Sequence, residues 1–334
     1  MKRMNILIPD VLSEPADIEA EIFGSDADII VGEATSHKDI TDEIWMNCEG
    51  ILAWDVIDYN AELISKLKKC KVIVRVGVGF NNVDLMAAKK KKIVVCNVPD
   101  YGTGEVADHA IAFLLSLCRG LPEYTRRLRN REWNRFNPMA ERLDKKVMGI
   151  IGLGRIGTAT AMRAKAFGMK IIFYDPYIKD GVDKALNFTR VDTLQEIAEF
   201  SDVISIHTPL TSETHDMINE EFFGLVKKEP VIINTARGPI IDLSALEKAM
   251  REGIVKSAGL DVLPVEPSDD TQQLIVDWEN GEAWIRDRLI ITPHCGFYSQ
   301  AALLELRQKA AREVLRVFNG ERARNCVNNY YDID

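Results

Sequence analysis

A glycine-rich strand-to-helix turn is the feature that most restricts the fold of this chain. The apolar run Val147–Gly152 leads into the turn, and the helix-forming run Thr158–Phe167 follows it. Gly152, Gly154 and Gly157 have the spacing G-x-G-x-x-G. The first glycine allows a tight turn, the second lets a pyrophosphate approach the backbone, and the third lets the helix pack closely on the strand. The sequence therefore predicts a βαβ unit that binds a dinucleotide.

The residues around this turn also predict which dinucleotide is bound. Arg155 and Ile156, within the turn, are expected to contact the cofactor near the start of the helix, where free N–H groups and the helix dipole favour phosphate. The next expected strand ends at Asp175, 18 residues after Gly157. A carboxylate at this place accepts hydrogen bonds from the adenosine ribose and repels a 2′-phosphate. We therefore expect NAD rather than NADP as the cofactor.

Short apolar runs alternate with helix-like stretches, which is typical of parallel α/β sheets. The expected strands are Asn5–Pro9, Asp28–Gly32, Gly50–Trp54, Lys71–Val76 and Ile93–Val98, then Val147–Gly152, Lys170–Asp175, Val203–His207, Val231–Ala236, Ser257–Asp261 and Leu289–Thr292. A long apolar helix, Gly104–Arg119, separates the two series, and a final helix, Gln300–Phe318, is long enough to return to the first.

These patterns predict an α/β protein of two doubly wound parallel-sheet domains. A Rossmann NAD-binding domain at residues 101–299 is expected to be inserted in a flavodoxin-like substrate-binding domain. That second domain would consist of residues 1–100 and 300–334.

Three polar residues follow the ends of expected strands in the second series: Arg237, Glu266 and His294. Ligands of doubly wound sheets bind at the carboxyl ends of strands. A guanidinium can hold a carboxylate through two parallel hydrogen bonds, and an imidazole can donate and accept protons near neutral pH. A carboxylate beside the imidazole would orient it and favour its charged form. Taken singly, Arg237 could form a surface ion pair, Glu266 could be a plain loop residue, and His294 could be a hydrogen-bonded core histidine. Together, they favour reduction of a 2-keto acid.

The composition argues against several other classes of protein. Lys and Arg number 42 against 51 Asp and Glu, a net charge of −9, so a nucleic-acid partner is not expected. No stretch reaches the ~18 apolar residues that span a bilayer, so we expect no membrane partner. The apolar stretch near Met1 is too short for a signal peptide. The six cysteines form no C-x-x-C pair, so we expect no bound metal and a cytoplasmic location.

At these residues the chain resembles the D-isomer-specific 2-hydroxyacid dehydrogenase family. Beyond the glycine turn, the motifs that carry the resemblance are 77–84 (GVGFNNVD), 207–209 (HTP), 234–238 (NTARG), 259–262 (GLDV) and 292–294 (TPH). The branch that it resembles most is that of the C-terminal binding proteins, through residues 74–77, 164–168, 173–177, 297–300 and 324–328.

The resemblance implies further site residues and partners. Arg75, Val76, Gly77, Val78 and Gly79 would contact the substrate, and Phe297 would line its pocket where the animal co-repressors carry Trp. Thr235, Ala236 and Asp261 would hold the nicotinamide ribose and carboxamide, His207 and Thr208 would border the adenine, and Val106 would lie near the nicotinamide phosphate. The substrate would be a small 2-keto or 2-hydroxy acid, and the protein would be a homodimer.

Three questions stay open at the level of sequence. The chain could be a dehydrogenase or an NAD(H)-sensing binding protein like the co-repressors. Arg75 could bind a second anionic group of the substrate, share its carboxylate, or form a structural ion pair. The acidic segment Ser268–Arg288, with Trp278 and Trp284, could be a lid, a dimer contact or a plain surface insertion.

Overall fold

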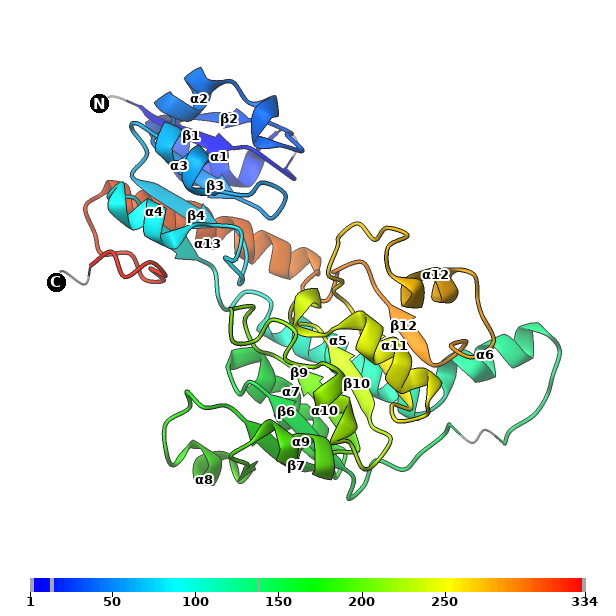
Figure 1. The fold of residues 1–334 in the computed structure, drawn as a ribbon. Helices are drawn as coiled ribbons and strands as arrows, with labels where there is room; N and C mark the ends of the chain where they lie inside the picture. Colours follow the sequence, from blue (N-terminus) through cyan, green and yellow to red (C-terminus); the bar gives the residue numbers. More distant parts are fainter. Residues whose placement is uncertain (1–2, 13–14, 137–138, 332–334) are drawn as a thin grey trace. The chain divides into compact units, whose positions relative to one another are not determined.

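The chain folds into two compact units (Figure 1). The computed structural model describes residues 3–12, 15–136 and 139–331. Unit 1 combines Met1–Gly102 with Tyr298–Asp334, and unit 2 is Thr103–Phe297. Unit 2 is therefore inserted into the chain of unit 1.

Unit 1 is built on a five-stranded parallel sheet with the order β2-β1-β3-β4-β5. This is the flavodoxin-like order expected from the sequence. The strands are β1 (Met4–Ile8), β2 (Ala27–Val31), β3 (Gly50–Ala53), β4 (Val72–Arg75) and β5 (Val94–Asn97). Strands β3, β4 and β5 are buried along their whole length, as is usual for parallel strands covered on both faces.

The helices of unit 1 cover this sheet. They are α1 (Asp17–Phe23), α2 (Asp42–Asn47), α3 (Ala61–Lys66), α4 (Leu85–Lys90) and α13 (Gln300–Phe318). The C-terminal helix α13 has the bounds expected from its apolar spacing, and it packs on α1, β3 and β4. The last helix of the chain therefore completes the core of the first domain.

Unit 2 contains a seven-stranded parallel sheet with the order β12-β11-β10-β9-β6-β7-β8. The strands are β6 (Val147–Ile151), β7 (Lys170–Tyr174), β8 (Thr189–Arg190), β9 (Val203–Ile206), β10 (Val231–Asn234), β11 (Ser257–Leu260) and β12 (Leu289–Ile291). The strand order reverses between β6 and β9, as in the Rossmann fold. The two-residue edge strand β8 is too short to give a pattern in the sequence.

The helices of unit 2 differ from the expectations in two places. They are α5 (Thr103–Cys118), α6 (Leu121–Arg129), α7 (Arg155–Ala166), α8 (Val182–Leu186), α9 (Leu194–Phe200), α10 (Glu220–Gly224), α11 (Leu243–Arg251) and α12 (Gln273–Glu279). Helix α7 begins three residues before the expected Thr158, because Gly154 caps it directly. The residues after α5 form a separate helix, α6, which was not among the expected elements, because Gly120 turns the chain with φ +63°.

The acidic segment at 268–288 packs onto unit 2. Its helix α12 contacts α11, and its buried Leu274, Ile275 and Ile285 belong to the core of the unit. The indole of Trp278 donates to Leu289 O at 3.1 Å. The buried apolar side chains of α12 and Ile285 are therefore part of the domain core, whereas residues 268–271 are exposed.

In the part of the chain that the structure describes, no helix is both long and apolar enough to cross a membrane. All six cysteines are free thiols.

Candidate active site

The glycine turn between β6 and α7 has the close backbone packing that its spacing predicts. Gly152 has φ +89°, and a Cβ there would lie 2.9 Å from the main chain of His207. A Cβ on Gly157 would lie 2.0 Å from the carbonyl oxygen of Gly152. A Cβ on Gly154 would meet no atom within 4 Å. The packing of the protein itself therefore requires glycine at positions 152 and 157. The space beside Gly154 is open and could hold a phosphate.

Asp175 lies at the end of β7, beside this turn. Its carboxylate accepts hydrogen bonds from Leu153 N at 2.8 Å and from Tyr177 N at 2.9 Å. These two bonds orient the carboxylate and join the ends of β6 and β7. The acid is therefore positioned next to the glycine turn, where the ribose of a dinucleotide is expected.

Several polar side-chain atoms around the ends of the strands are buried without a protein partner. His207 Nδ1, Thr208 Oγ1 and Thr235 Oγ1 each lack one. His207 Nε2 lies 2.8 Å from Ser205 Oγ, and burial lowers the pKa of His207 to about 3, so the ring is neutral. Buried polar atoms without a partner are rare in folded proteins. The orphaned atoms and the open space at Gly154 fit a bound dinucleotide.

Two other residues expected near the cofactor are placed as follows. Val106 is buried in the first turns of α5. The N–H of Ala236 donates to Asn234 Oδ1 at 2.9 Å, and this bond shapes the loop after β10.

Arg237, Glu266 and His294 follow three adjacent strands, β10, β11 and β12. The loops of the first two touch, because a Cβ on Gly238 would lie 1.9 Å from the carbonyl carbon of Leu263. Glu266 accepts a hydrogen bond from Leu263 N at 2.8 Å through Oε1, and its Oε2 lies 2.7 Å from His294 Nδ1. The structure therefore pairs the histidine with the glutamate. The guanidinium of Arg237 donates to Ala236 O at 2.7 Å.

The backbone at His294 has φ +49°, and Asp261 holds the loop on both sides of it. The carboxylate of Asp261 is buried and accepts hydrogen bonds from Cys295 N and Gly296 N, each at 2.9 Å. The carbonyl of Asp261 accepts from His294 N at 2.8 Å. Both carboxylate oxygens of Asp261 therefore bind this loop, and the contact with the nicotinamide that the resemblance implied stays a prediction.

His109, on α5, is a polar member of this network that the sequence analysis missed. Its Nε2 lies 2.9 Å from Thr292 Oγ1 and 3.5 Å from Asp261 Oδ1. Among the described residues, the potential ligand atoms of His109, Asp261 and Cys295 lie within 4.8 Å of one another. The Asp261 oxygens already accept hydrogen bonds, so a bonded network explains the cluster. A lone histidine on an apolar helix gave no signal in the sequence.

The residues expected to contact the substrate are divided between the two units. In unit 2, the ring of Phe297 lies edge-on to His294, with 6.4 Å between centroids. In unit 1, Arg75 ends β4, and Val76 and Gly77–Gly79 form the loop that follows. Asn97 Nδ2 donates to Val78 O at 2.6 Å and holds this loop. Within the described chain, the N–H groups of Val78 and Gly79 donate to no other residue.

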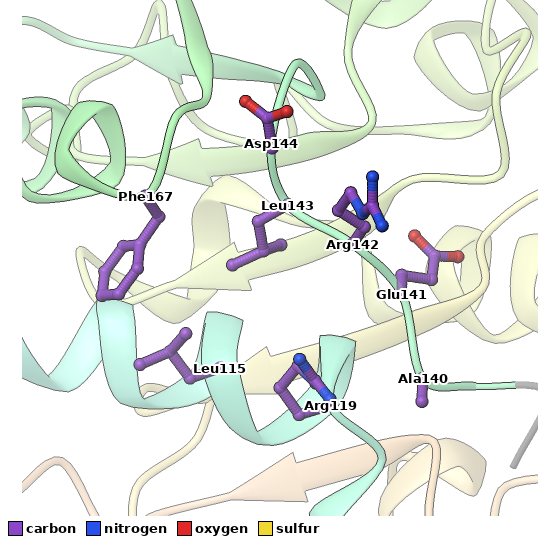
Figure 2. Close-up of a pocket in the computed structure, with 8 residues that line it drawn as sticks. All are labelled: Leu115, Arg119, Ala140, Glu141, Arg142, Leu143, Asp144 and Phe167. Atoms are coloured by element: carbon purple, nitrogen blue, oxygen red, sulfur yellow. The ribbon is translucent and has the colours of Figure 1, made fainter. Parts of the chain in front are cut away.

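A separate hollow of about 520 Å³ lies elsewhere on unit 2 (Figure 2). Leu115 of α5 and Arg119, just after that helix, line it, with residues 140–144 and Phe167. It contains none of the expected site residues.

Fold and glycine turn together define a dinucleotide-binding α/β protein. Residues 111–296 match the family model for the NAD-binding domain of the D-isomer-specific 2-hydroxyacid dehydrogenases. The chain is 35% identical over 97% of its length to D-3-phosphoglycerate dehydrogenase of Methanocaldococcus jannaschii, and it spans 59% of that enzyme.

Two solved structures are similar to both units. A D-lactate dehydrogenase of Aquifex aeolicus, complexed with NAD and lactic acid, is 32% identical with a TM-score of 0.83, and the match covers 95% of this chain and 96% of that one. An NADPH-dependent glyoxylate/hydroxypyruvate reductase of Sinorhizobium meliloti is 27% identical with a TM-score of 0.84, over 98% and 97% of the two chains. The chain belongs to the D-isomer-specific 2-hydroxyacid dehydrogenase family, and its cofactor is NAD.

Proposed function

We propose that this protein is an NAD-dependent dehydrogenase that interconverts a small 2-keto acid and the corresponding D-2-hydroxy acid. The contact between Glu266 and His294 carries the proposal. A histidine held by a carboxylate is well suited to transfer a proton to a carbonyl oxygen. NADH supplies the hydride when it is bound.

In this proposal His294 is the acid and base. Its Nδ1 faces Glu266 Oε2 at 2.7 Å, which leaves Nε2 to exchange a proton with the substrate oxygen. The carboxylate fixes which ring nitrogen faces the substrate. Glu266 is therefore a positioning residue, since its two oxygens are bound to His294 and Leu263 N.

Arg237 is proposed to hold the substrate carboxylate and polarise the adjacent carbonyl. A guanidinium binds a carboxylate in a planar fork, which also fixes the orientation of the keto group. The position of Arg237 after β10, next to the loop that carries Glu266, supports this role. In unit 1, Arg75 and the N–H groups of Val78 and Gly79 are also proposed to contact the substrate.

For the cofactor, Gly154, Arg155 and Ile156 would face the phosphates, and Asp175 the adenosine ribose. A carboxylate at Asp175 disfavours the 2′-phosphate of NADP. His207 and Thr208 would border the adenine, and Val106 the nicotinamide phosphate. Thr235, Ala236 and Asp261 would hold the nicotinamide ribose and carboxamide, and Asp261 also shapes the His294 loop.

The test is NADH oxidation with a panel of 2-keto acids: glyoxylate, hydroxypyruvate, 2-ketoglutarate and sulfopyruvate. We expect at least one to be reduced. On that substrate His294→Ala should lower kcat by about 10²–10⁴-fold, the usual contribution of a general acid. The affinity for NADH should change little, and His215→Ala, at an exposed histidine, is the control. Near-normal turnover of His294→Ala would contradict the proposal.

A protein that binds NADH but reduces none of these acids would instead fit the NAD(H)-sensing alternative. The likeness to the C-terminal binding protein branch stays a prediction from sequence motifs. A homodimer and a cytoplasmic location are also proposals. Exposed Trp133 and Phe136, in the segment after α6, support the dimer, and the six free thiols are compatible with a reducing compartment.

A further inference from the structure

Arg75 is a buried cationic residue beside the proposed substrate loop of unit 1. The structure gives its guanidinium an acidic partner. Only 7% of the residue is exposed, and its Nε has no partner. One terminal nitrogen donates to Val76 O and packs against Gly77, where a Cβ would lie 1.9 Å away. The other lies 3.7 Å from Asp55 Oδ2. The positive charge of Arg75 is therefore already paired with an acid of the same unit.

Asp55 is held in place by the loop that carries it. The loop follows β3, and buried Asp10 accepts hydrogen bonds from Trp54 N at 3.1 Å, Val56 N at 2.9 Å and Ile57 N at 3.2 Å. Asn82 Nδ2 donates to two carbonyls of the same loop, Trp54 O at 3.0 Å and Ile57 O at 2.9 Å. The Asp55 side chain itself is 52% exposed. An accessible carboxylate is thus presented beside Arg75 on a fixed loop.

The charges at this place oppose a second anionic group on the substrate. Arg75 contributes one positive charge, and Asp55 contributes one negative charge next to it. Asp10 lies beneath the same loop; its burial raises the pKa of this carboxyl, and the neighbouring Asp55 acts in the same direction. A phosphate, sulfonate or second carboxylate near Arg75 would approach Asp55 as well, and like charges at such distances repel.

We propose that Asp55 is a specificity-determining residue that restricts the enzyme to 2-keto acids with a single anionic group. A neutral or hydroxylated side chain is accepted, because a carboxylate accepts a hydrogen bond from a hydroxyl group. Arg75 and the Val78 and Gly79 amides then bind the carboxylate that all 2-keto acids carry. This proposal rests on the proposed dehydrogenase function and names its substrate class.

The experiment compares two substrates that differ only in a phosphate, hydroxypyruvate and 3-phosphohydroxypyruvate. The wild-type protein should favour hydroxypyruvate in kcat/KM by at least about tenfold, and Asp55→Asn should reduce that preference by about tenfold. Asp58→Asn, an exposed acid of the same loop, is the matched control and should leave the ratio unchanged. Melting temperatures establish that each variant folds.

Two results would overturn the proposal. One is a wild-type protein that uses the phosphorylated substrate as well as or better than hydroxypyruvate. The other is an Asp55→Asn variant with an unaltered ratio. A protein that oxidises NADH with neither substrate nor any acid of the panel would reject the dehydrogenase function itself, which is a different failure.

Discussion

The glycines of the β6–α7 turn have separable roles at the scale of single residues. The backbone at Gly154 has φ −73° and ψ −161°, which alanine can adopt, and no atom lies within 4 Å of the added Cβ. Gly157 has no such space, because Gly152 O would be 2.0 Å away. One position is therefore open for a ligand, and the other is filled by the protein.

This difference predicts two distinct mutant phenotypes. Gly154→Ala should keep the melting temperature of the wild type within a few degrees but weaken NADH binding about tenfold or more, since the methyl group enters the space of the pyrophosphate. Gly157→Ala should lower both the melting temperature and the affinity. Thermal unfolding and NADH titration by fluorescence measure the two effects. Equal loss of stability in the two variants would contradict the assignment.

His207 predicts a pH dependence of stability. Its pKa is lowered to about 3 in the folded protein by burial, against about 6.5 in an unfolded chain. Between these values the unfolded chain binds a proton that the folded protein does not. Stability therefore falls as the pH falls through this window, by at most about 1.4 kcal/mol per pH unit from this group.

Melting temperatures from pH 7 to pH 4 test this prediction. The wild type should lose stability more steeply than His207→Gln, which cannot be protonated. His215→Gln removes an exposed histidine and serves as the control. Parallel curves for the wild type and His207→Gln would show that the proton is not excluded from this site.

At the scale of elements, ion pairs of Arg307 join the first and last helices of unit 1. Arg307 of α13 donates to both carboxylate oxygens of Glu19 on α1, at 2.9 Å and 2.6 Å, and to Asp17 at 2.9 Å. Arg307 and Glu19 are buried. Removing one partner of a buried pair leaves an uncompensated charge, whereas replacing both with apolar residues is often neutral.

Arg307→Met should accordingly reduce the free energy of unfolding of unit 1 by about 3–5 kcal/mol. Adding Glu19→Leu to this variant should restore most of the loss. Urea unfolding of the two variants and the wild type provides the comparison. A double variant no more stable than Arg307→Met would mean that packing, and not the unpaired charge, dominates at this helix contact.

At the scale of the whole molecule, unit 2 exposes apolar residues together in one segment. Trp133 is 83% exposed and Phe136 is 79% exposed, and Leu121 and Leu128 of the preceding α6 are also exposed. In Figure 1 this helix extends away from the seven-stranded sheet of its own unit. Clustered exposed aromatic residues are typical of protein–protein interfaces.

The proposed homodimer would bury this segment. Replacing both Trp133 and Phe136 with Glu should shift the protein from dimer to monomer, which light scattering measures as a halving of the mass. Met86→Glu, at an exposed apolar residue of α4 in unit 1, is the control. A wild-type protein that is monomeric at micromolar concentration would reject the dimer.

Much of the fold follows from local patterns in the sequence. The apolar runs of β3, β4, β9 and β10 predict buried parallel strands, because both faces of each must be covered. The spacing of Gly152, Gly154 and Gly157 predicts a strand–turn–helix unit, because a side chain at these positions would obstruct the tight turn, the approach of the pyrophosphate or the packing of the helix on the strand. A short element such as the two-residue strand β8 carries too little local signal.

The sequence by itself determined the alternation of strands and helices, the dinucleotide turn and the candidate residues Arg237, Glu266 and His294. Only the tertiary structure decided which groups meet. His109 contacts Thr292 across 183 positions, and Asp10 holds a loop 44 to 47 positions away. Local preferences act over a few residues, whereas these contacts arise when the sheets form and bring the ends of distant strands together. The pairing of Asp55 with Arg75, and with it the proposed choice of substrate, is a property of that assembled sheet.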